Sequence, residues 1–310
     1  MQLSKLLKQG LSFLGDVYYR TRVLTKLGYY DKLSDSDFLK TVFPKYMDYP
    51  LDLENPKSFS EKLQWLKIHN RKPIHTKMVD KYEAKSFITE AVGAEYVIPA
   101  IGVWDSVDDI DFDSLPPQFV LKCTHDSGGL VICKDRKTFD IEAAKKTLQK
   151  SLSRDYYRIA REWAYHDVPR RIIAEPYMEE LGEKNLLDYK MFVFNGQPKL
   201  TIVCSDRFSK NGTKMNFYDL DWKPMKVGFR LHELAVPEFP RPQTFDDMLR
   251  VARILSKDCP FIRIDFYEIN GHLYVGELTL FPGAGFEPFR SIDMDYEVGG
   301  WLDLETVHRS

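Results

Sequence analysis

Four residues near the C-terminus have side chains that could bind a metal ion and a phosphate group. Arg263 and Asp265 alternate along one predicted strand, and Glu277 and Thr279 alternate along the next. Alternate residues of a strand lie on the same face of its sheet. Carboxylates are hard oxygen ligands for Mg²⁺, which commonly shares them with substrate phosphates. The pattern therefore predicts a cation site on this hairpin, although a surface hairpin with an exposed ion pair would show the same alternation.

The length of the turn around Gly271 decides which of these residues pair across the hairpin. A two-residue turn would place Glu277 opposite Ile264. A three-residue loop, closed by Gly271 in the left-handed region, would place Glu277 opposite Arg263 and diagonal to Asp265. The second register separates the charges from the apolar residues, and burying unpaired charges is costly. We therefore expect the three-residue loop.

A second candidate group follows the apolar stretch 119–121. Lys122 ends this predicted buried strand, and the loop after it contains Ser127, Gly128 and Gly129. A buried lysine needs an anionic partner, and glycines let backbone N–H groups approach phosphate oxygens. The loop matches neither GxxxxGK[ST] nor GxGxxG, so Walker-type and Rossmann-type sites are unsupported. A phosphate-binding loop and a simple glycine turn both fit this pattern.

Composition sets limits on the partners of the 310-residue chain. Its 44 basic and 46 acidic residues give a formal charge of −2, which argues against binding nucleic acid through bulk charge. The four cysteines include no CxxC pair and we see no secretory leader, so a cytoplasmic protein with reduced thiols is expected. Leucines and two lysines in residues 3–14 predict a short amphipathic helix, which could pack on the protein or contact a membrane surface.

The distribution of predicted elements indicates the fold class. Strands after residue 119 are mostly linked as hairpins, which favours an antiparallel α+β fold behind a helical N-terminal region. Ser58 and Glu61 have the spacing of a capping box at a helix start. Further helices are predicted over 77–92, 141–163 and 245–256, and residues 205–242 are expected to be irregular.

Five motifs occur along the chain in the order that the ATP-grasp superfamily carries. They are Asp80-Lys81, Phe119–Lys122 with its small-residue loop, Ile173–Tyr177, Arg263-Ile264-Asp265 and Glu277-Leu278-Thr279. The chain resembles this superfamily over most of its length. FSEKLQWLK, VLKCTHDSGG and DYKMFVFNG make it more similar to the TupA-like branch, associated with bacterial surface-polysaccharide biosynthesis. The resemblance implies an ATP-grasp fold, in which antiparallel sheets grip the nucleotide.

The resemblance also implies four parts of the chain. Residues 1–75 would form the helical N-terminal region, and 76–118 would form a small α/β segment before the nucleotide site. Residues 119–178 would form the nucleotide lid, and 179–310 would form the catalytic and metal-binding part.

The cofactors that the resemblance implies are ATP and Mg²⁺. The residues implied to bind the nucleotide are Lys81, Lys122, Ser127, Gly128, Gly129, Glu175, Pro176 and Tyr177, the last three as a hinge that reads adenine. Those implied to act in catalysis are Arg263, Lys190 and Asp188. Those implied to ligate magnesium are Asp265, Glu277 and Thr279, with Thr279 where the wider superfamily has asparagine.

The activity implied by the resemblance is that of a carboxylate–amine ligase working through an acyl-phosphate. The expected partners are a small-molecule carboxylate and an amine, with a uronic-acid-type sugar of a surface polysaccharide as the acceptor. One alternative is a kinase for a sugar or lipid-linked glycan hydroxyl, with Asp126 or Asp188 as base. Another is a non-catalytic nucleotide-binding component of a glycan-assembly complex. The expected location is the cytoplasm, or the cytoplasmic face of the inner membrane if the N-terminal helix contacts it.

Overall fold

The computed structural model describes residues 16–178, 186–205, 213–236 and 238–309. The leucine-rich segment 3–14, for which an amphipathic helix was predicted, lies outside these residues. None of the helices in the described part combines the length and the apolar character needed to cross a bilayer.

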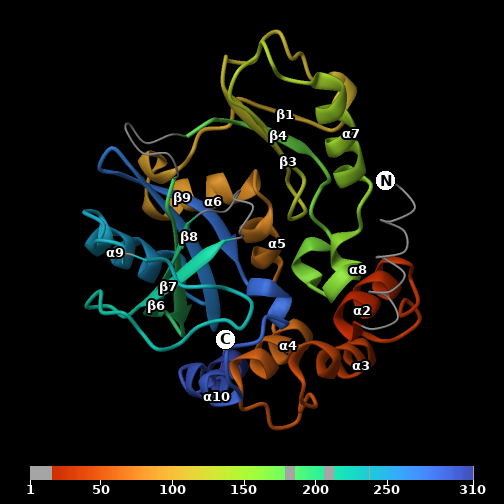
Figure 1. The fold of residues 1–310 in the computed structure, drawn as a ribbon, viewed down its shortest axis with the longest axis vertical. Helices are drawn as coiled ribbons and strands as arrows, with labels where there is room; N and C mark the ends of the chain where they lie inside the picture. The colour runs from red at the N-terminus through yellow and green to blue at the C-terminus, as the bar shows by residue number, and fades with distance from the viewer. Residues whose placement is uncertain (1–15, 179–185, 206–212, 237, 310) are drawn as a thin grey trace.

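Two antiparallel sheets organise the protein, which confirms the predicted α+β class (Figure 1). The small sheet has the strand order β1-β4-β2-β3, and the large sheet has the order β7-β6-β5-β8-β9. The strands of the small sheet are β1 Gly102–Trp104, β2 Phe119–Cys123, β3 Leu130–Cys133 and β4 Ile172–Pro176. Those of the large sheet are β5 Asp188–Phe194, β6 Gln197–Ser205, β7 Lys214–Tyr218, β8 Phe261–Ile269 and β9 His272–Thr279.

The helices surround these sheets, and Figure 1 shows the small sheet with α7 at one end of the long axis. The N-terminal helices are α2 Val17–Lys26, α3 Asp35–Met47, α4 Phe59–His69, α5 Pro73–Val79 and α6 Glu83–Val92. The later helices are α7 Ile141–Leu152, α8 Tyr156–Ala160, α9 Phe245–Leu255 and α10 Ile292–Gly299. The capping box at the start of α4 is present, because the Ser58 hydroxyl accepts from the Glu61 N–H and the Glu61 carboxylate accepts from the Ser58 N–H.

Two of the predicted helices are interrupted, and one segment predicted to be irregular contains a strand. The break in 77–92 follows from Asp80, whose carboxylate accepts from the N–H groups of Tyr82 and Glu83 and so starts a new helix. The helix predicted over 141–163 divides into α7 and α8 in the same way, with Asp155 accepting from the Arg158 N–H at the start of α8. Strand β7, within 205–242, completes an edge of the large sheet by pairing with β6.

One face of the large sheet is aromatic at one end and charged at the other. At the aromatic end, Phe59 of α4 packs against Phe261, Phe194 and Phe192, with ring centroids 4.9, 5.6 and 6.0 Å away. Further along the same face, Lys190 of β5 pairs with Asp265 of β8, and Arg263 lies on the same face two residues before Asp265. Helix α4 therefore closes the apolar end of this face and leaves the charged end for the site.

The hairpin register differs from the prediction. Ile269 pairs with His272, so the turn has two residues, Asn270 and Gly271, with φ values of 52° and 75°. The predicted three-residue loop is therefore wrong, although the left-handed conformation of Gly271 is confirmed. Two consecutive left-handed residues are what a type I′ turn requires, and Asn-Gly is the dipeptide that supplies them most readily.

A β-bulge in β9 brings the charges onto one face despite the two-residue turn. The register shifts by one residue between Asp265 and Phe266, so Asp265 pairs with Glu277 while Phe266 pairs with Val275. The residue left over is Gly276. Arg263 consequently lies opposite Thr279, and the predicted pairing of Arg263 with Glu277 is wrong. The bulge, and not a longer loop, therefore places the charged residues on one face.

Glycine at position 276 is required by close packing inside the bulge. A Cβ atom built there would lie 2.4 Å from Cε2 of Tyr267, well inside van der Waals contact. Gly276→Ala should therefore lower the free energy of unfolding by about 1–3 kcal/mol, the usual cost of overpacking. Urea denaturation measures this change. In a Tyr267→Ala background the same substitution should cost much less, and an equal cost in both backgrounds would show that the ring is not the obstacle.

Candidate functional site

A row of alternating charge crosses three strands of the large sheet. Lys190 pairs with Asp265, and Asp265 pairs with Glu277, so the three side chains are neighbours on β5, β8 and β9. The Asp265 carboxylate accepts from Lys190 Nζ at 2.5 Å and from Arg263 Nε and Nη2 at 2.6 and 2.8 Å. Lys190 also reaches Asp188 at 2.7 Å. The predicted catalytic and metal-binding side chains thus form one connected group.

Asp265 is ionised at the centre of this group. Its burial would raise the pKa, but the Arg263 guanidinium and the Lys190 ammonium more than offset that effect and lower the pKa below its usual value. Arg263 also donates from Nη2 to the hydroxyl of Thr279 at 3.0 Å. The two cations therefore fix both the charge and the orientation of the carboxylate.

Glu277 is the open end of the row. Its side chain is 32% exposed, against 4% for that of Asp265. Lys81 Nζ lies 3.4 Å from Glu277 Oε1 and donates to the Asp126 carbonyl oxygen at 2.6 Å. Burial opposes ionisation of Glu277, yet the Lys81 charge holds its pKa below the usual value. Lys81 thus links the metal-ligand candidate to the loop after β2.

The second cluster lies on the small sheet and on α6. Glu175 of β4 accepts from Lys122 of β2 and from Lys85 of α6, each at 2.6 Å. Lys85 also donates to the Ile98 carbonyl oxygen at 2.5 Å. Glu175 is only 5% exposed. Burial alone would raise its pKa, but the charges of Lys122 and Lys85 more than offset this effect and hold the pKa below its usual value. Two cations around one anion leave one positive charge, which a bound anion would balance.

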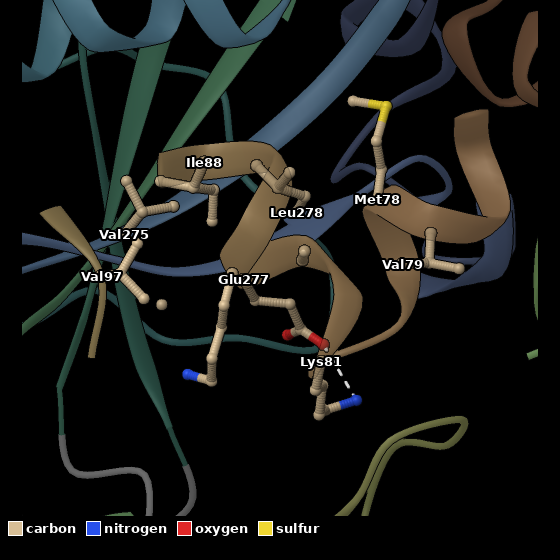
Figure 2. Close-up of a pocket in the computed structure, with 11 residues that line it drawn as sticks. Met78, Val79, Lys81, Ile88, Val97, Val275, Glu277 and Leu278 are labelled. Atoms are coloured by element: carbon tan, nitrogen blue, oxygen red, sulfur yellow. Dashed lines mark ion pairs between the residues drawn. The ribbon is translucent and has the colours of Figure 1, made fainter. Parts of the chain in front are cut away.

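Lys85 is a residue that the sequence reasoning missed. It follows Lys81 by four residues, the spacing that would bring two side chains to the same side of an unbroken helix. In the structure Lys81 lies in the break between α5 and α6, and Lys85 lies within α6. Lys81, Lys85 and Glu277 line one pocket. Figure 2 shows Lys81 and Glu277 in this pocket, whose apolar wall is formed by Met78, Val79, Ile88, Val97, Val275 and Leu278.

The loop after β2 is held at its base and exposed at its tip. The Asp126 carboxylate accepts from Arg154 Nη1 at 2.9 Å and from the hydroxyl of Ser151. Gly129 packs so closely that a Cβ would lie 1.9 Å from the Ser151 oxygen, whereas Gly128, at φ +100°, has open space around it. Ser127 and Gly128 are exposed. The loop therefore presents free backbone from a fixed base, as a phosphate-covering segment needs.

The predicted hinge is only partly joined to these clusters. Glu175 contacts both lysines, and Pro176 ends β4 opposite Phe119. The Tyr177 ring lies instead beneath Lys134, whose Nζ is 5.1 Å from the ring centroid. The structure therefore brings the acid of the hinge into the site and turns its tyrosine toward β3 and the loop after it.

The residues present fit a divalent cation that is shared with phosphates. Within the described ranges, no three His, Cys, Asp or Glu side chains are grouped closely enough to hold a metal by themselves. Asp265 and Glu277 are two adjacent, ionised carboxylates, one of them open to solvent. Mg²⁺ typically takes one or two carboxylates and completes its shell with water and phosphate oxygens.

A buried lysine and a buried glutamate lie beneath the charged row. Lys67 of α4 is fully buried and donates from Nζ to the carbonyl oxygens of Ala160 and Ala284 at 2.8 and 2.7 Å. Burial lowers its pKa to about 7 and raises that of Glu162 to about 7, while each charge favours the other. The charge of Glu277 also raises the pKa of Glu162, and that of Arg263 lowers it. The pattern of FSEKLQWLK, which surrounds Lys67 with apolar residues, was the available sequence signal for this burial.

A known protein family matches most of the chain. The family described as TupA-like ATPgrasp matches residues 61–302. No curated protein sequence matches the chain.

Similar solved structures include three ATP-grasp-type proteins. The D-alanine–D-alanine ligase of Bacillus anthracis, complexed with ATP, has 18% identity and a TM-score of 0.39, over 66% of this chain and 55% of that one. The chain thus spans about half the length of that ligase. The D-alanine–D-alanine ligase of Helicobacter pylori has 13% identity and a TM-score of 0.44, over 82% and 69%. A RimK domain protein from Sphaerobacter thermophilus has 12% identity and a TM-score of 0.42, over 75% and 70%.

The buried lysine provides a test of how the site floor is held. Lys67→Ala would remove two hydrogen bonds and leave Glu162 without its compensating charge. We therefore expect the free energy of unfolding to fall by about 3–5 kcal/mol. Chemical denaturation measures the loss. Lys40→Ala, on the exposed side of α3, is the control and should change stability by less than about 0.5 kcal/mol. Similar small effects for both variants would contradict the assigned role of Lys67.

Proposed function

Because the chain belongs to the TupA-like ATP-grasp family, we propose that it is an ATP-dependent ligase that joins a carboxylate to an amine. Its cofactors are ATP and Mg²⁺. The proposal rests on the presence of two clusters whose charges suit different parts of a metal–nucleotide complex. One, Lys85–Glu175–Lys122, has an excess positive charge suited to phosphate, and the other presents adjacent carboxylates suited to a cation.

The nucleotide lies between these clusters. Lys85 and Lys122 approach it from α6 and β2, and each would exchange part of its contact with Glu175 for a phosphate oxygen. The backbone of Ser127–Gly129 covers the phosphates, which the exposure of Ser127 and Gly128 supports. Lys81 is placed to neutralise a phosphate because it already stands between Glu277 and the base of this loop. Glu175 to Tyr177 form the adenine side, as the family pattern implies.

The metal ligands are Asp265 and Glu277, with Thr279 beside them. When bound, Mg²⁺ neutralises charge on the nucleotide phosphates. Arg263 and Lys190 hold the Asp265 carboxylate in one orientation through three hydrogen bonds, so a cation bound beside Glu277 would meet a carboxylate that is already ordered. Arg263 is also positioned to stabilise negative charge that develops during transfer, since its guanidinium reaches from Asp265 toward Glu277 at 3.9 Å.

The reaction has two steps. The substrate carboxylate attacks the γ-phosphorus of ATP, forming an acyl-phosphate and releasing ADP. The amine then attacks the acyl carbon, the C–O bond to phosphate breaks, and inorganic phosphate leaves as the amide forms with loss of the amine proton. The chain's contribution to both steps is charge neutralisation and positioning.

The chemistry of a kinase is less well supported by the side chains present. A hydroxyl acceptor needs a general base, and the two candidates were Asp126 and Asp188. Asp126 is engaged by Arg154 and Ser151, and Asp188 is engaged by Lys190. Both carboxylates are also fully or nearly fully buried. An amine nucleophile attacking an activated acyl group places a smaller demand on such a base.

The substrates in this proposal are an amino acid or other amine and a uronic-acid-type sugar of a bacterial surface polysaccharide, used in the cytoplasm. The family association with surface polysaccharides supports this choice. The decisive experiment is an ADP-release screen of amino acids against uronic acids in free, nucleotide-linked and lipid-linked forms. ADP with inorganic phosphate supports the ligase, ADP with a phosphorylated acceptor supports the kinase, and no turnover with any pair supports a binding component.

Nucleotide affinity tests the lysine cluster. Lys122→Ala and Lys85→Ala should each weaken ATP binding by about 1–3 kcal/mol, because each removes a charge-assisted contact. Isothermal calorimetry provides the measurement. The matched control is Lys145→Ala on α7, whose ammonium lies 3.7 Å from a surface aspartate, and it should bind ATP as the wild type does. Unchanged affinity in folded Lys85 and Lys122 variants would rule out this cluster as the phosphate site.

Metal dependence tests the carboxylate pair. Glu277→Gln should reduce ADP release by about 100-fold or more while leaving the melting temperature close to that of the wild type, because it removes a ligand charge and no core contact. Raising the Mg²⁺ concentration should recover part of the loss. Glu90→Gln, at an exposed ion pair on α6, is the control and should keep full activity. Normal Mg²⁺ dependence in Glu277→Gln would remove this residue from the metal site.

Isotope transfer tests the order of bond making. With a substrate whose carboxylate oxygens carry ¹⁸O, one labelled oxygen should appear in the inorganic phosphate, because the carboxylate oxygen becomes the bridging oxygen of the acyl-phosphate. Mass spectrometry of the released phosphate measures the label. Turnover that yields unlabelled phosphate would exclude the acyl-phosphate route even if ADP is formed.

A further inference from the structure

Helix α2 is built differently from an ordinary surface helix. The side chains it buries are those of Thr21 and Thr25, two small polar residues. Of its large apolar residues, Leu24 packs against the neighbouring core, whereas Val17 and Tyr18 are 45% and 40% exposed. In the loop directly after the helix, Leu27 is 75% exposed and Tyr29 is 71% exposed. Several large apolar side chains at this end of the chain therefore remain in solvent.

Positive charge gathers around these exposed apolar side chains. Arg22, Lys26 and Lys150 of α7 are exposed, and no acidic residue occurs within α2. Arg22 and Lys26 lie four residues apart in α2 and so share one side of the helix. Partial burial, together with the charges of Arg22, Arg154 and Lys150, lowers the pKa of Lys26. The nearby acid Asp31 is neutralised by Arg158, whose Nε lies 2.6 Å from Oδ1. We call Arg22, Lys26, Leu27, Tyr29 and Lys150 the α2 patch.

The first 33 residues, which include α2, have the same character. Up to residue 33 the chain carries six basic residues and only two acidic ones, whereas the whole chain has a formal charge of −2. The remainder is therefore acidic, and the positive charge is concentrated at this end. Figure 1 shows α2 on the opposite side of the molecule from α9.

We propose that the α2 patch docks the protein on an anionic phospholipid bilayer. The chemistry of the patch fits a lipid interface, because Leu and Tyr side chains insert among headgroups while Arg and Lys contact the anionic lipids. Charge complementarity selects the membrane over a neutral apolar partner. Docking is independent of the ligase chemistry, and it would place the enzyme where lipid-linked acceptors are found.

Vesicle co-sedimentation of the full chain tests the proposal. The protein should bind vesicles of phosphatidylcholine mixed with phosphatidylglycerol, bind pure phosphatidylcholine weakly, and dissociate as salt is raised. Arg22→Gln with Lys26→Gln should lower partitioning about 25-fold, since each basic residue near an anionic surface contributes about fivefold. Leu27→Ser with Tyr29→Ser should also weaken binding, without changing its salt dependence.

Matched controls separate the patch from other surfaces. Leu231→Ser removes an apolar side chain that is 64% exposed elsewhere, and it should leave partitioning unchanged. Thermal melting and ATP affinity verify that every variant is folded. The proposal is overturned if the wild type does not bind anionic vesicles, if it binds neutral ones equally, or if the α2 patch variants bind as well as the wild type. The last outcome would assign binding to another part of the chain.

Discussion

The ion pairs around Asp265 are the constraint on which the site depends. A carboxylate this deeply buried stays ionised only because Arg263 and Lys190 both contact it. The contact with Lys190 in turn requires that β5 and β8 align with one another to the residue, and the neighbouring position of Glu277 requires the same of β8 and β9. A shift of one residue in either strand pairing would move a charge into the apolar face of the sheet. The electrostatics of the site and the register of the large sheet therefore stabilise each other.

The two clusters are joined by very few residues. Lys85 connects α6 to the small sheet through Glu175, and Lys81 connects the start of α6 to β9 through Glu277. Both lysines depend on the helix break that Asp80 creates, since its carboxylate caps α6. Asp80 is itself held by Arg171, at 2.8 Å. The connection between the small-sheet cluster and the carboxylate row thus runs through a short segment that the Asp80 carboxylate holds in place.

The segment after β9 is supported from below by α4. Gly283, Ala284 and Gly285 have left-handed backbone conformations, which for Ala284 carries a steric cost. Gln64 donates to the carbonyl oxygens of Ala284 and Gly285, and Lys67 donates to that of Ala284. These bonds offset the strain and fix the chain directly beyond Thr279. The helical N-terminal region is consequently part of the site's support.

The sequence by itself determined the features that depend on local pattern. The α+β class, the capping box at Ser58 and the left-handed Gly271 follow from spacing and side-chain type. Asp265 and Glu277 do share one face, as predicted, but the bulge at Gly276 places them there and not the predicted loop length. The tertiary structure decided what depends on packing between distant segments. The bulge leaves Gly276 unpaired, and this residue must be glycine because the Tyr267 ring occupies the space of a Cβ, a contact that no local pattern reveals. The pairing of Lys85 with Glu175 and the burial of Lys67 likewise arise only when helices and sheets meet, because a charge is buried only where another part of the chain compensates it.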